Sequence, residues 1–264
     1  MNPLKMNTLL AKVDHTQSVF NAQLAHLANY FKTRQGAFRG EKKTYTPREG
    51  YPEEPSKMGT TQVQATVKEQ LDYFAEIAKK YMTELFSVEA TNSAGAKKVE
   101  LIVGNQSFGE MTALDLMRLK SLLTSKELQA VYDNIPVYSD TEAWSRSDDQ
   151  DYTGREVLET PLIQGVSRTT ETEEVILRDP NIDPHNIPAN YRAAVVSKRK
   201  TVEIGDYTLQ KFSGEWSQRQ KAELLARKSE LLKAVIAALK EVNDGEVEQP
   251  NVDVEAVLNY IHGN

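Results

Sequence analysis

The sequence predicts an α+β fold, with long antiparallel amphipathic helices packed with a small antiparallel β-rich middle region. Apolar residues recur at spacings of three and four near both ends of the chain, the pattern of helices that bury one face. Between residues 137 and 216 this spacing disappears and Val, Thr, Ile and Tyr become frequent, which is typical of strands. We therefore expect one domain, 1–264, with a mainly helical part (1–136), a β-rich part (137–216) and a helical part (217–264).

The composition is that of an ordinary globular protein. Of the 264 residues, 39% are hydrophobic and 27% are charged, so the chain can bury a sizeable core. No cysteine is present, which excludes disulfides, thiolate metal sites and a cysteine nucleophile and suits a reducing cytoplasm. Neither a signal peptide nor a membrane span is expected, because no apolar run is long enough. The net charge of −6 argues against general nucleic-acid binding.

Two long helices are predicted at the start of the chain. The first ends at Gly36 and Gly40, and a proline-containing loop from Arg39 to Met58 separates it from the second. Helices joined in this way are most simply an antiparallel pair. Their apolar stripes are Leu9, Val13, Thr16, Phe20, Leu24, Leu27 and Phe31 in the first helix, and Val63, Val67, Leu71, Phe74, Ile77, Tyr81, Leu85 and Val88 in the second.

A short hairpin and a third helix follow. Residues alternate in polarity from Val99 to Val103, and the dipeptide Gly104-Asn105 after them is typical of a hairpin turn. The segment Thr112 to Asp115 has the pattern of a helix N-cap and opens a helix that extends to Tyr132. A second capping pattern from Thr124 to Glu127 indicates a break in this helix.

Strands are predicted in the middle part and helices after it. Val166–Leu177 and Tyr191–Phe212 are rich in strand-forming residues, and Gly205-Asp206 is expected to make a hairpin turn within the second segment. Prolines predict a loop from Asp179 to Pro188. In the last part, Ser217 and Gln220 have the pattern of a helix cap, and after a break at residues 245–250 a short helix is expected around residues 254–261.

Basic residues gather in segments far apart in an acidic chain, and a basic cleft would attract a small anion. Gly36 to Thr44 resembles a phosphate-binding loop only superficially, because its glycines are one residue too close and Glu41 stands where lysine belongs. For each segment two interpretations stay open, a solvated loop or strand edge and a set of contacts to a bound anion. The candidate ligand-binding residues are Arg39, Lys42, Lys43, Tyr45, Arg168, Lys198, Arg199, Tyr207, Lys211, Ser213 and Gly214.

No motif in the sequence predicts a catalytic residue, a metal site or a cofactor. The four histidines have no helical pairing typical of zinc ligands. The acids of Asp179–Asp183 lack the glycine and glutamate of a calcium loop, and Ser147–Asp151 fits a solvated loop better than a magnesium site. A nucleophile elbow and a dinucleotide fingerprint are also missing. Carboxylates distant in sequence can still meet in the folded chain, so an unusual enzyme remains a hypothesis.

Short motifs along the chain together resemble a family of uncharacterised bacterial and bacteriophage proteins, a domain of unknown function near this length. The resemblance spans nearly the full chain, implies one compact unit and brings no established activity. Residues 182–194 and the acidic tail depart from the pattern, so a site in them would be in doubt. The matching parts are Lys42–Pro47, Val63–Ala65, Glu89–Thr91, Val99–Gly104, Leu114–Pro136, Trp144, Gly205, Phe212–Gly214, Leu224–Arg227, Asn243 and Tyr260.

Three hypotheses about function result. By analogy with small phage proteins that sequester nucleotide signals of host immunity, the first is a non-enzymatic protein that captures a small anionic, nucleotide-like ligand. In it Arg and Lys neutralise charge, Tyr45 or Tyr207 stacks, and Ser213 and Gly214 donate hydrogen bonds. We expect it in the cytoplasm of a bacterial or phage-infected cell, as a homo-oligomer with the pocket shared between copies. The alternative is a structural or protein-interaction module, and the third is an enzyme acting on nucleotides.

Overall fold

The computed structural model describes residues 5–54, 57–177, 192, 194–244 and 252–262. The loop predicted from Asp179 to Pro188 lies outside these residues. The fold is α+β, as the sequence predicts, and it divides into two compact units. The helical unit consists of Met1–Asn29, Tyr73–Asn134 and Arg219–Asn264, and the strand unit consists of Tyr30–Asp72 and Ile135–Gln218. That the chain forms a single domain stays a prediction.

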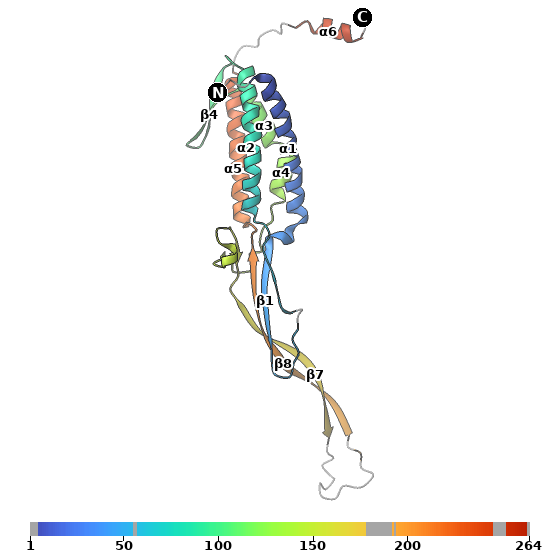
Figure 1. The fold of residues 1–264 in the computed structure, drawn as a ribbon. Helices are drawn as coiled ribbons and strands as arrows, with labels where there is room; N and C mark the ends of the chain where they lie inside the picture. Colours follow the sequence, from blue (N-terminus) through green and yellow to red (C-terminus); the bar gives the residue numbers. More distant parts are fainter. Residues whose placement is uncertain (1–4, 55–56, 178–191, 193, 245–251, 263–264) are drawn as a thin grey trace. The chain divides into compact units, whose positions relative to one another are not determined.

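In the helical unit, the long helices lie side by side (Figure 1). The ring of Phe20 stacks on those of Phe74 and Tyr81, with ring centroids 5.7 and 5.0 Å apart. Together with the hydrogen bond from Thr16 Oγ1 to Glu84 Oε2 (2.7 Å), these contacts confirm the antiparallel pairing of the first two helices. The helices are α1 (Met6–Thr33), α2 (Val67–Asn92), α3 (Ala113–Leu123), α4 (Lys126–Asp133), α5 (Gln218–Val242) and α6 (Val254–His262).

Local capping signals place the shorter elements of the helical unit. Strands β3 (Lys98–Val103) and β4 (Gln106–Thr112) form the predicted hairpin around Gly104, whose φ of 59° suits glycine. Thr112 and Asp115 form the predicted capping box of α3. The break after α3 is also confirmed, although the N-cap of α4 is Ser125 rather than Thr124. A core between these elements and α5 contains Val99, Leu101, Leu116, Leu119, Leu123, Val235, Ala238 and Val242.

The strand unit is built on an antiparallel sheet whose central strand, β8, is 20 residues long. On one side of β8 lie β1 and then β2; on the other side lies β7, with β6 and β5 at the end of β8. Val63, Tyr152, Val157 and Phe212 form a buried cluster. The strands are β1 (Arg39–Pro47), β2 (Gly59–Thr61), β5 (Ser145–Arg146), β6 (Leu158–Glu159), β7 (Ile163–Leu177) and β8 (Ala194–Ser213), with short 3₁₀ helices η1 (Gln35–Phe38) and η3 (Gln150–Tyr152).

The structure corrects the prediction that a loop begins at Arg39. Residues Arg39–Pro47 form strand β1, which pairs along its whole length with β8. Pro47 is the last residue of the strand, so the pairing of the residues before it is uninterrupted. Gly40 lies within β1, opposite Phe212, rather than ending the helix. Glycine is needed there for space, because a Cβ would be 2.7 Å from the carbonyl oxygen of Thr61. The first helix was predicted to end at Gly36 and Gly40. It ends at Thr33, close to Gly36, so this part of the prediction agrees with the structure.

The hairpin turn predicted at Gly205-Asp206 is also wrong, because β8 continues through both residues. A bulge gives β8 one extra residue, Ile204, opposite the step from Ser167 to Arg168 in β7. Gly205 is needed for space: a Cβ at this position would lie 2.5 Å from ring atoms of Tyr45. The glycine thus accommodates an aromatic ring from the neighbouring strand and does not turn the chain.

The predicted C-terminal helix is present as α6. Its apolar side chains, including Val254, Val257 and Ile261, are exposed. No helix within the described ranges is both long and apolar enough to cross a membrane.

Candidate functional site

A cavity of about 450 Å³ in the strand unit contains two of the predicted cations, Arg39 and Lys211. They come from neighbouring strands that pair in antiparallel register, so the fold brings together residues far apart in the sequence. Trp144 and Glu142, from the segment before β5, add an aromatic and an acidic side chain that were not among the predicted ligand-binding residues. The lining residues are Gly36, Arg39, Gly40, Glu41, Thr61, Ser139, Glu142, Trp144, Lys211, Phe212 and Glu215.

Both cations in the cavity already bind a carboxylate. Arg39 Nε donates to Glu215 Oε1 at 2.8 Å, and the Glu215 side chain is only 3% exposed. Burial raises the pKa of the Glu215 carboxyl above its ordinary value, while the charge of Arg39 and hydrogen bonds from Arg39 and Ser213 oppose this shift. Lys211 is paired in the same way with Glu142. The cavity is therefore lined by ion pairs and not by free positive charge.

The predicted hydrogen-bond donors Ser213 and Gly214 have partners within the chain. Ser213 Oγ donates to Glu215 Oε2 at 3.2 Å, and Ser213 is 1% exposed. The amide of Gly214 donates to the carbonyl of Phe38 at 2.8 Å. A Cβ on Gly214 would lie 2.6 Å from the carbonyl oxygen of Ala65, which explains the glycine by close packing. These residues hold the turn from β8 together.

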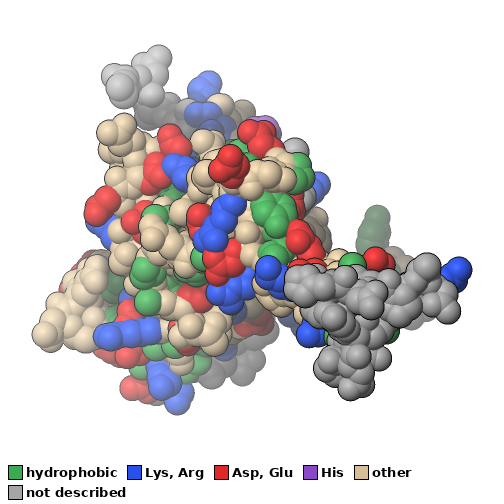
Figure 2. All heavy atoms as spheres, turned by 90° about the horizontal axis from the view of Figure 1, so that it is seen from below, with side chains coloured by type: hydrophobic (Ala, Val, Ile, Leu, Met, Phe, Trp, Pro, Cys, Tyr) green, Lys and Arg blue, Asp and Glu red, His purple; other side chains and the backbone are tan. Residues whose placement is uncertain are grey.

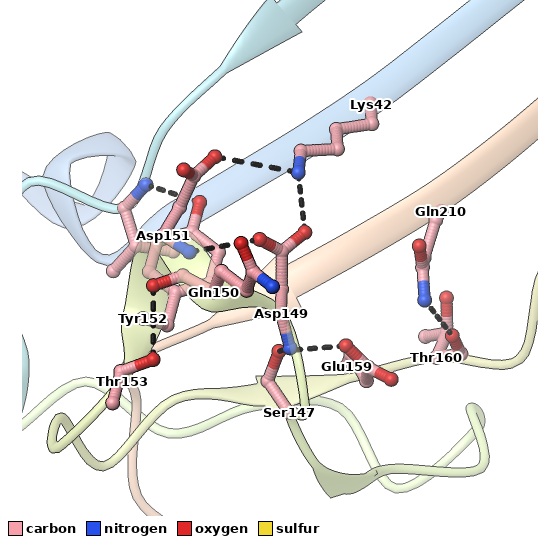
Figure 3. A network of polar contacts seen from close by, with 11 residues as sticks. Lys42, Ser147, Asp149, Gln150, Asp151, Tyr152, Thr153, Glu159, Thr160 and Gln210 are labelled. Carbon is pink, nitrogen blue, oxygen red and sulfur yellow. Dashed lines mark hydrogen bonds and ion pairs between the residues drawn. The ribbon is translucent and has the colours of Figure 1, made fainter.

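Lys42 and Lys43 each face carboxylates. The ammonium of Lys42 lies between Asp149 and Asp151, with the Asp151 Oδ2 atom at 3.4 Å (Figure 3). It also lies 5.5 Å from the centre of the Phe212 ring. The hydrogen bond between Lys42 and Asp149 raises the pKa of Lys42 and lowers that of Asp149. Lys43 Nζ lies 2.6 Å from an oxygen of Glu41 in the same strand. Lys42 therefore attaches the segment around η3 to β1.

The two tyrosines predicted to stack on a ligand instead cover glycines of adjacent strands. The ring of Tyr45 packs over Gly205, its hydroxyl donates to the carbonyl of Ile204 at 3.2 Å, and the residue is 4% exposed. Tyr207 packs over Gly165 and remains exposed on one side. Such pairs fill the space that a glycine leaves in a sheet. For Tyr45 no face is left for a ligand.

The remaining predicted cations lie far from the cavity. Lys198 and Lys211 are on the same strand, and at about 3.3 Å per residue they are roughly 40 Å apart. Arg199 is next to Lys198, and Arg168 Nη2 lies 3.1 Å from Glu203 Oε1. In the view of Figure 2, Lys and Arg side chains are interspersed with Asp and Glu. Of the predicted cations, Arg39 and Lys211 line the cavity described above, whereas Lys198 lies far along β8 from it.

A second candidate surface is the part of the β7–β8 pair beyond the bulge, residues 168–177 and 194–203, which we call the ribbon. The two strands twist around each other past the end of β1 (Figure 1). Every residue from Ala194 to Thr201 is exposed, as is every residue from Glu171 to Glu174. A two-stranded ribbon has no core of its own and is marginally stable in water.

The ribbon ends in apolar side chains on both faces. Val175 lies opposite Val196 and Ile176 lies opposite Val195, and successive pairs point to opposite faces. Ile176 is 62% exposed and Val195 is 54% exposed. Apolar side chains gathered at an exposed end are typical of surfaces that bind another chain.

The residues that the structure describes contain no cluster of three or more His, Cys, Asp or Glu side chains able to hold a metal ion. Comparisons with curated proteins and with solved structures gave no match. A family match covers almost the whole chain and confirms the resemblance to a domain of unknown function. The chain belongs to the family of unknown function DUF7873, which matches residues 3–264.

Proposed function

We propose that the protein is a structural subunit that binds other protein chains through its β-ribbon. The observation that carries this proposal is the exposure of the ribbon on both faces, with Ile176 and Val195 at its apolar end. Nothing among the described residues covers these side chains. A chain that leaves such an element in water gains stability when a partner buries it.

The backbone of the ribbon supports the same proposal. Among the described strands, β7 pairs only with β8, and β1 covers β8 only from Gly205 to Ser213. Unpaired N–H and C=O groups at a strand edge can accept a further strand from another chain. The exposed apolar stripe of α6, which includes Val257 and Ile261, is a second surface available for contacts in an assembly.

Site-specific photo-crosslinking tests the proposal. A photoreactive residue at Val195 should form a discrete protein adduct in cells that naturally make the protein. Tyr73, which is 60% exposed in α2, is the matched control and should not give that adduct. If Val195 gives no discrete adduct, or the same pattern as Tyr73, the ribbon is not a binding element.

Anion binding in the cavity is the second candidate function. It is favoured by the shared location of Arg39, Lys211 and Trp144, which offer two donors and an aromatic face. A bound anion would have to compete with Glu215 and Glu142 for these cations. This competition makes the anion hypothesis weaker than the assembly hypothesis.

Calorimetry with cyclic and ADP-ribose-type nucleotides tests the second candidate. Arg39→Ala and Lys211→Ala should each weaken binding by about 1–3 kcal/mol, the range for a charge-assisted contact. Arg199→Ala on the ribbon is the control and should leave the affinity unchanged. If no nucleotide binds, or if Arg199→Ala weakens binding as much as Lys211→Ala, the cavity is not the site.

A further inference from the structure

We infer that ribbons of neighbouring copies pair edge to edge with one polarity, so that β8 of one copy lies beside β7 of the next. This inference rests on the proposed function and names the partner as a second copy of the same chain. It follows from the free edges, the charge pattern and the register of the ribbon.

Both edges of the ribbon are free among the residues that the structure describes. The last backbone hydrogen bond on the outer edge of β8 runs from the Arg48 amide to the carbonyl of Ile204, at 2.9 Å, and the Arg48 guanidinium also binds the side chain of Glu203. From Glu203 to Ala194 the outer backbone of β8 has no strand beside it. The outer backbone of β7 is likewise unpaired over its length. Each copy can therefore pair with neighbouring copies through the outer edge of β7 and through the outer edge of β8.

The two edges carry opposite charges. Over residues 171–173 and 198–200, the β7 side of the ribbon contains Glu171 and Glu173, and the β8 side contains Lys198 and Lys200. The Glu171 carboxylate also accepts a hydrogen bond from the Tyr51 hydroxyl at 2.9 Å. Next to the bulge the signs are reversed, with Arg168 on β7 opposite Glu203 on β8. Glu171 is directly opposite Lys200, and Glu173 is directly opposite Lys198, so all four side chains point to the same face. Glu174 and Arg199 add the same signs of charge to the other face.

This pattern selects one way of pairing two ribbons. Two β8 edges brought together at these segments would place lysine against lysine, and two β7 edges would place glutamate against glutamate. Like charges directly opposite each other destabilise a pair of strands, whereas opposite charges stabilise it. Edge lysines can also keep strands apart, but here β7 presents the acidic edge that fits them. The mixed pairing is therefore favoured.

The register within one ribbon can be repeated between copies. If the next copy lies beside β8 in the same direction, its Glu173 comes opposite Lys198 and its Val175 comes opposite Val196, as in the ribbon itself. Ile176 of the next copy then lies beside Val195, and both side chains lose exposure to water. On both faces of the paired ribbons, charged side chains then lie beside charged side chains of opposite sign, and apolar side chains lie beside apolar ones.

A contact between two different edges is head-to-tail. Such a contact leaves one edge unused at each end of a pair, so assembly continues until a ring closes or a filament forms. We therefore expect oligomers larger than a dimer. Their stability should fall as salt is added, because exposed charges contribute to the contact.

A charge-exchange variant of the full chain tests the polarity. It carries Glu171→Lys, Glu173→Lys, Lys198→Glu and Lys200→Glu, so that each ribbon keeps opposite charges across its own two strands. Light scattering should show that wild type and variant each assemble to the same size. With donor and acceptor dyes, wild type should exchange with wild type but not with the variant, because the mixed contact places like charges together.

Other outcomes overturn the inference. Preferential assembly of wild type with the variant would indicate symmetric pairing of like edges, and free mixing would mean that the charges do not select the pairing. Monomers at all concentrations would exclude self-pairing. In that case an adduct of Val195 with a different protein would leave the proposed function intact, whereas the lack of any adduct would remove both.

A milder variant keeps the test valid if the fourfold exchange does not fold. Lys198→Gln with Lys200→Gln removes the two positive charges and introduces no repulsion. Two lost cross-strand charge pairs should weaken association about two- to thirtyfold and reduce its dependence on salt. Unchanged association and an unchanged salt dependence would contradict the inference.

Discussion

Replacement of Gly205 by alanine is the sharpest test of how the strand unit is packed. A Cβ at this position would lie 2.5 Å from Cε2, Cζ and the hydroxyl oxygen of Tyr45, where ordinary contacts are 3.4–4 Å. The ring has to move by about 1 Å, although Tyr45 is 4% exposed and its hydroxyl binds the carbonyl of Ile204. The buried ring has little room for this movement.

The expected loss of stability is the sum of three contributions, of which two destabilise the folded state and one stabilises it. Overpacking a buried site costs about 1–3 kcal/mol. Loss of the Tyr45 hydrogen bond adds about 0.5–1.5 kcal/mol. Alanine in place of glycine in a strand returns about 0.5–1 kcal/mol through the smaller entropy of the unfolded chain. We therefore expect Gly205→Ala to lower the free energy of unfolding of the strand unit by about 2 kcal/mol.

Gly165→Ala is the matched control. A Cβ at Gly165 would also lie 2.5 Å from a tyrosine ring, that of Tyr207, but Tyr207 is 36% exposed and its ring can rotate toward water. The same chemical change should therefore cost less than about 0.5 kcal/mol, as is usual for surface substitutions.

Urea unfolding monitored by tryptophan fluorescence measures both variants, because Trp144 and Trp216 both belong to the strand unit. In a Tyr45→Ala background, Gly205→Ala should no longer destabilise, which isolates the coupling between the two residues. Equal losses for the two glycine variants, or an unchanged unfolding midpoint for Gly205→Ala, would refute the steric explanation.

Three further predictions concern single contacts. Thr112→Ala should destabilise the helical unit by about 1 kcal/mol through loss of the α3 cap, which circular dichroism during urea unfolding would detect; an unchanged midpoint would contradict this. Arg118→Ala leaves the buried carboxylate of Glu89, which Arg118 Nε binds at 2.8 Å, without that partner and should cost about 1–3 kcal/mol, with partial recovery in Arg118→Lys. The hydrogen bond from Arg155 lowers the pKa of Glu69, so the advantage of the wild type over Glu69→Gln should be present at pH 7 and disappear as the pH falls through that lowered pKa. Stability curves at several pH values test this last prediction, and an advantage that grows in acid would contradict it.

Local signals in the sequence predicted the elements that depend on neighbouring residues. Helix stripes, the Gly104 turn and the capping box from Thr112 to Asp115 each involve residues a few positions apart, and the structure has them. The exception is Val63, which was predicted in the stripe of the second helix but lies before α2, in the buried cluster of the strand unit. Strand β1 was missed because its partner, β8, is distant in the sequence and helps decide that this segment is extended. Gly205 was misassigned for the same reason, since its role depends on Tyr45.

The candidate site was only partly predictable. The sequence identifies Lys42 and Lys211 as basic, but not the carboxylates that face them. Asp149 and Glu142 meet these lysines only because the chain returns to β1 and β8 after a long excursion. The predicted anion site was based on positive charge alone. In the fold, these positive charges form ion pairs with carboxylates of the same chain.

The length of β8 has a structural consequence within the strand unit. One uninterrupted backbone runs from the exposed end of the ribbon at Ala194 to Phe212 and Ser213, and no loop interrupts it. The bulge at Ile204 changes its twist without breaking it. The backbone that a partner would meet in the ribbon is therefore continuous with the backbone of Lys211 and Phe212, which line the cavity.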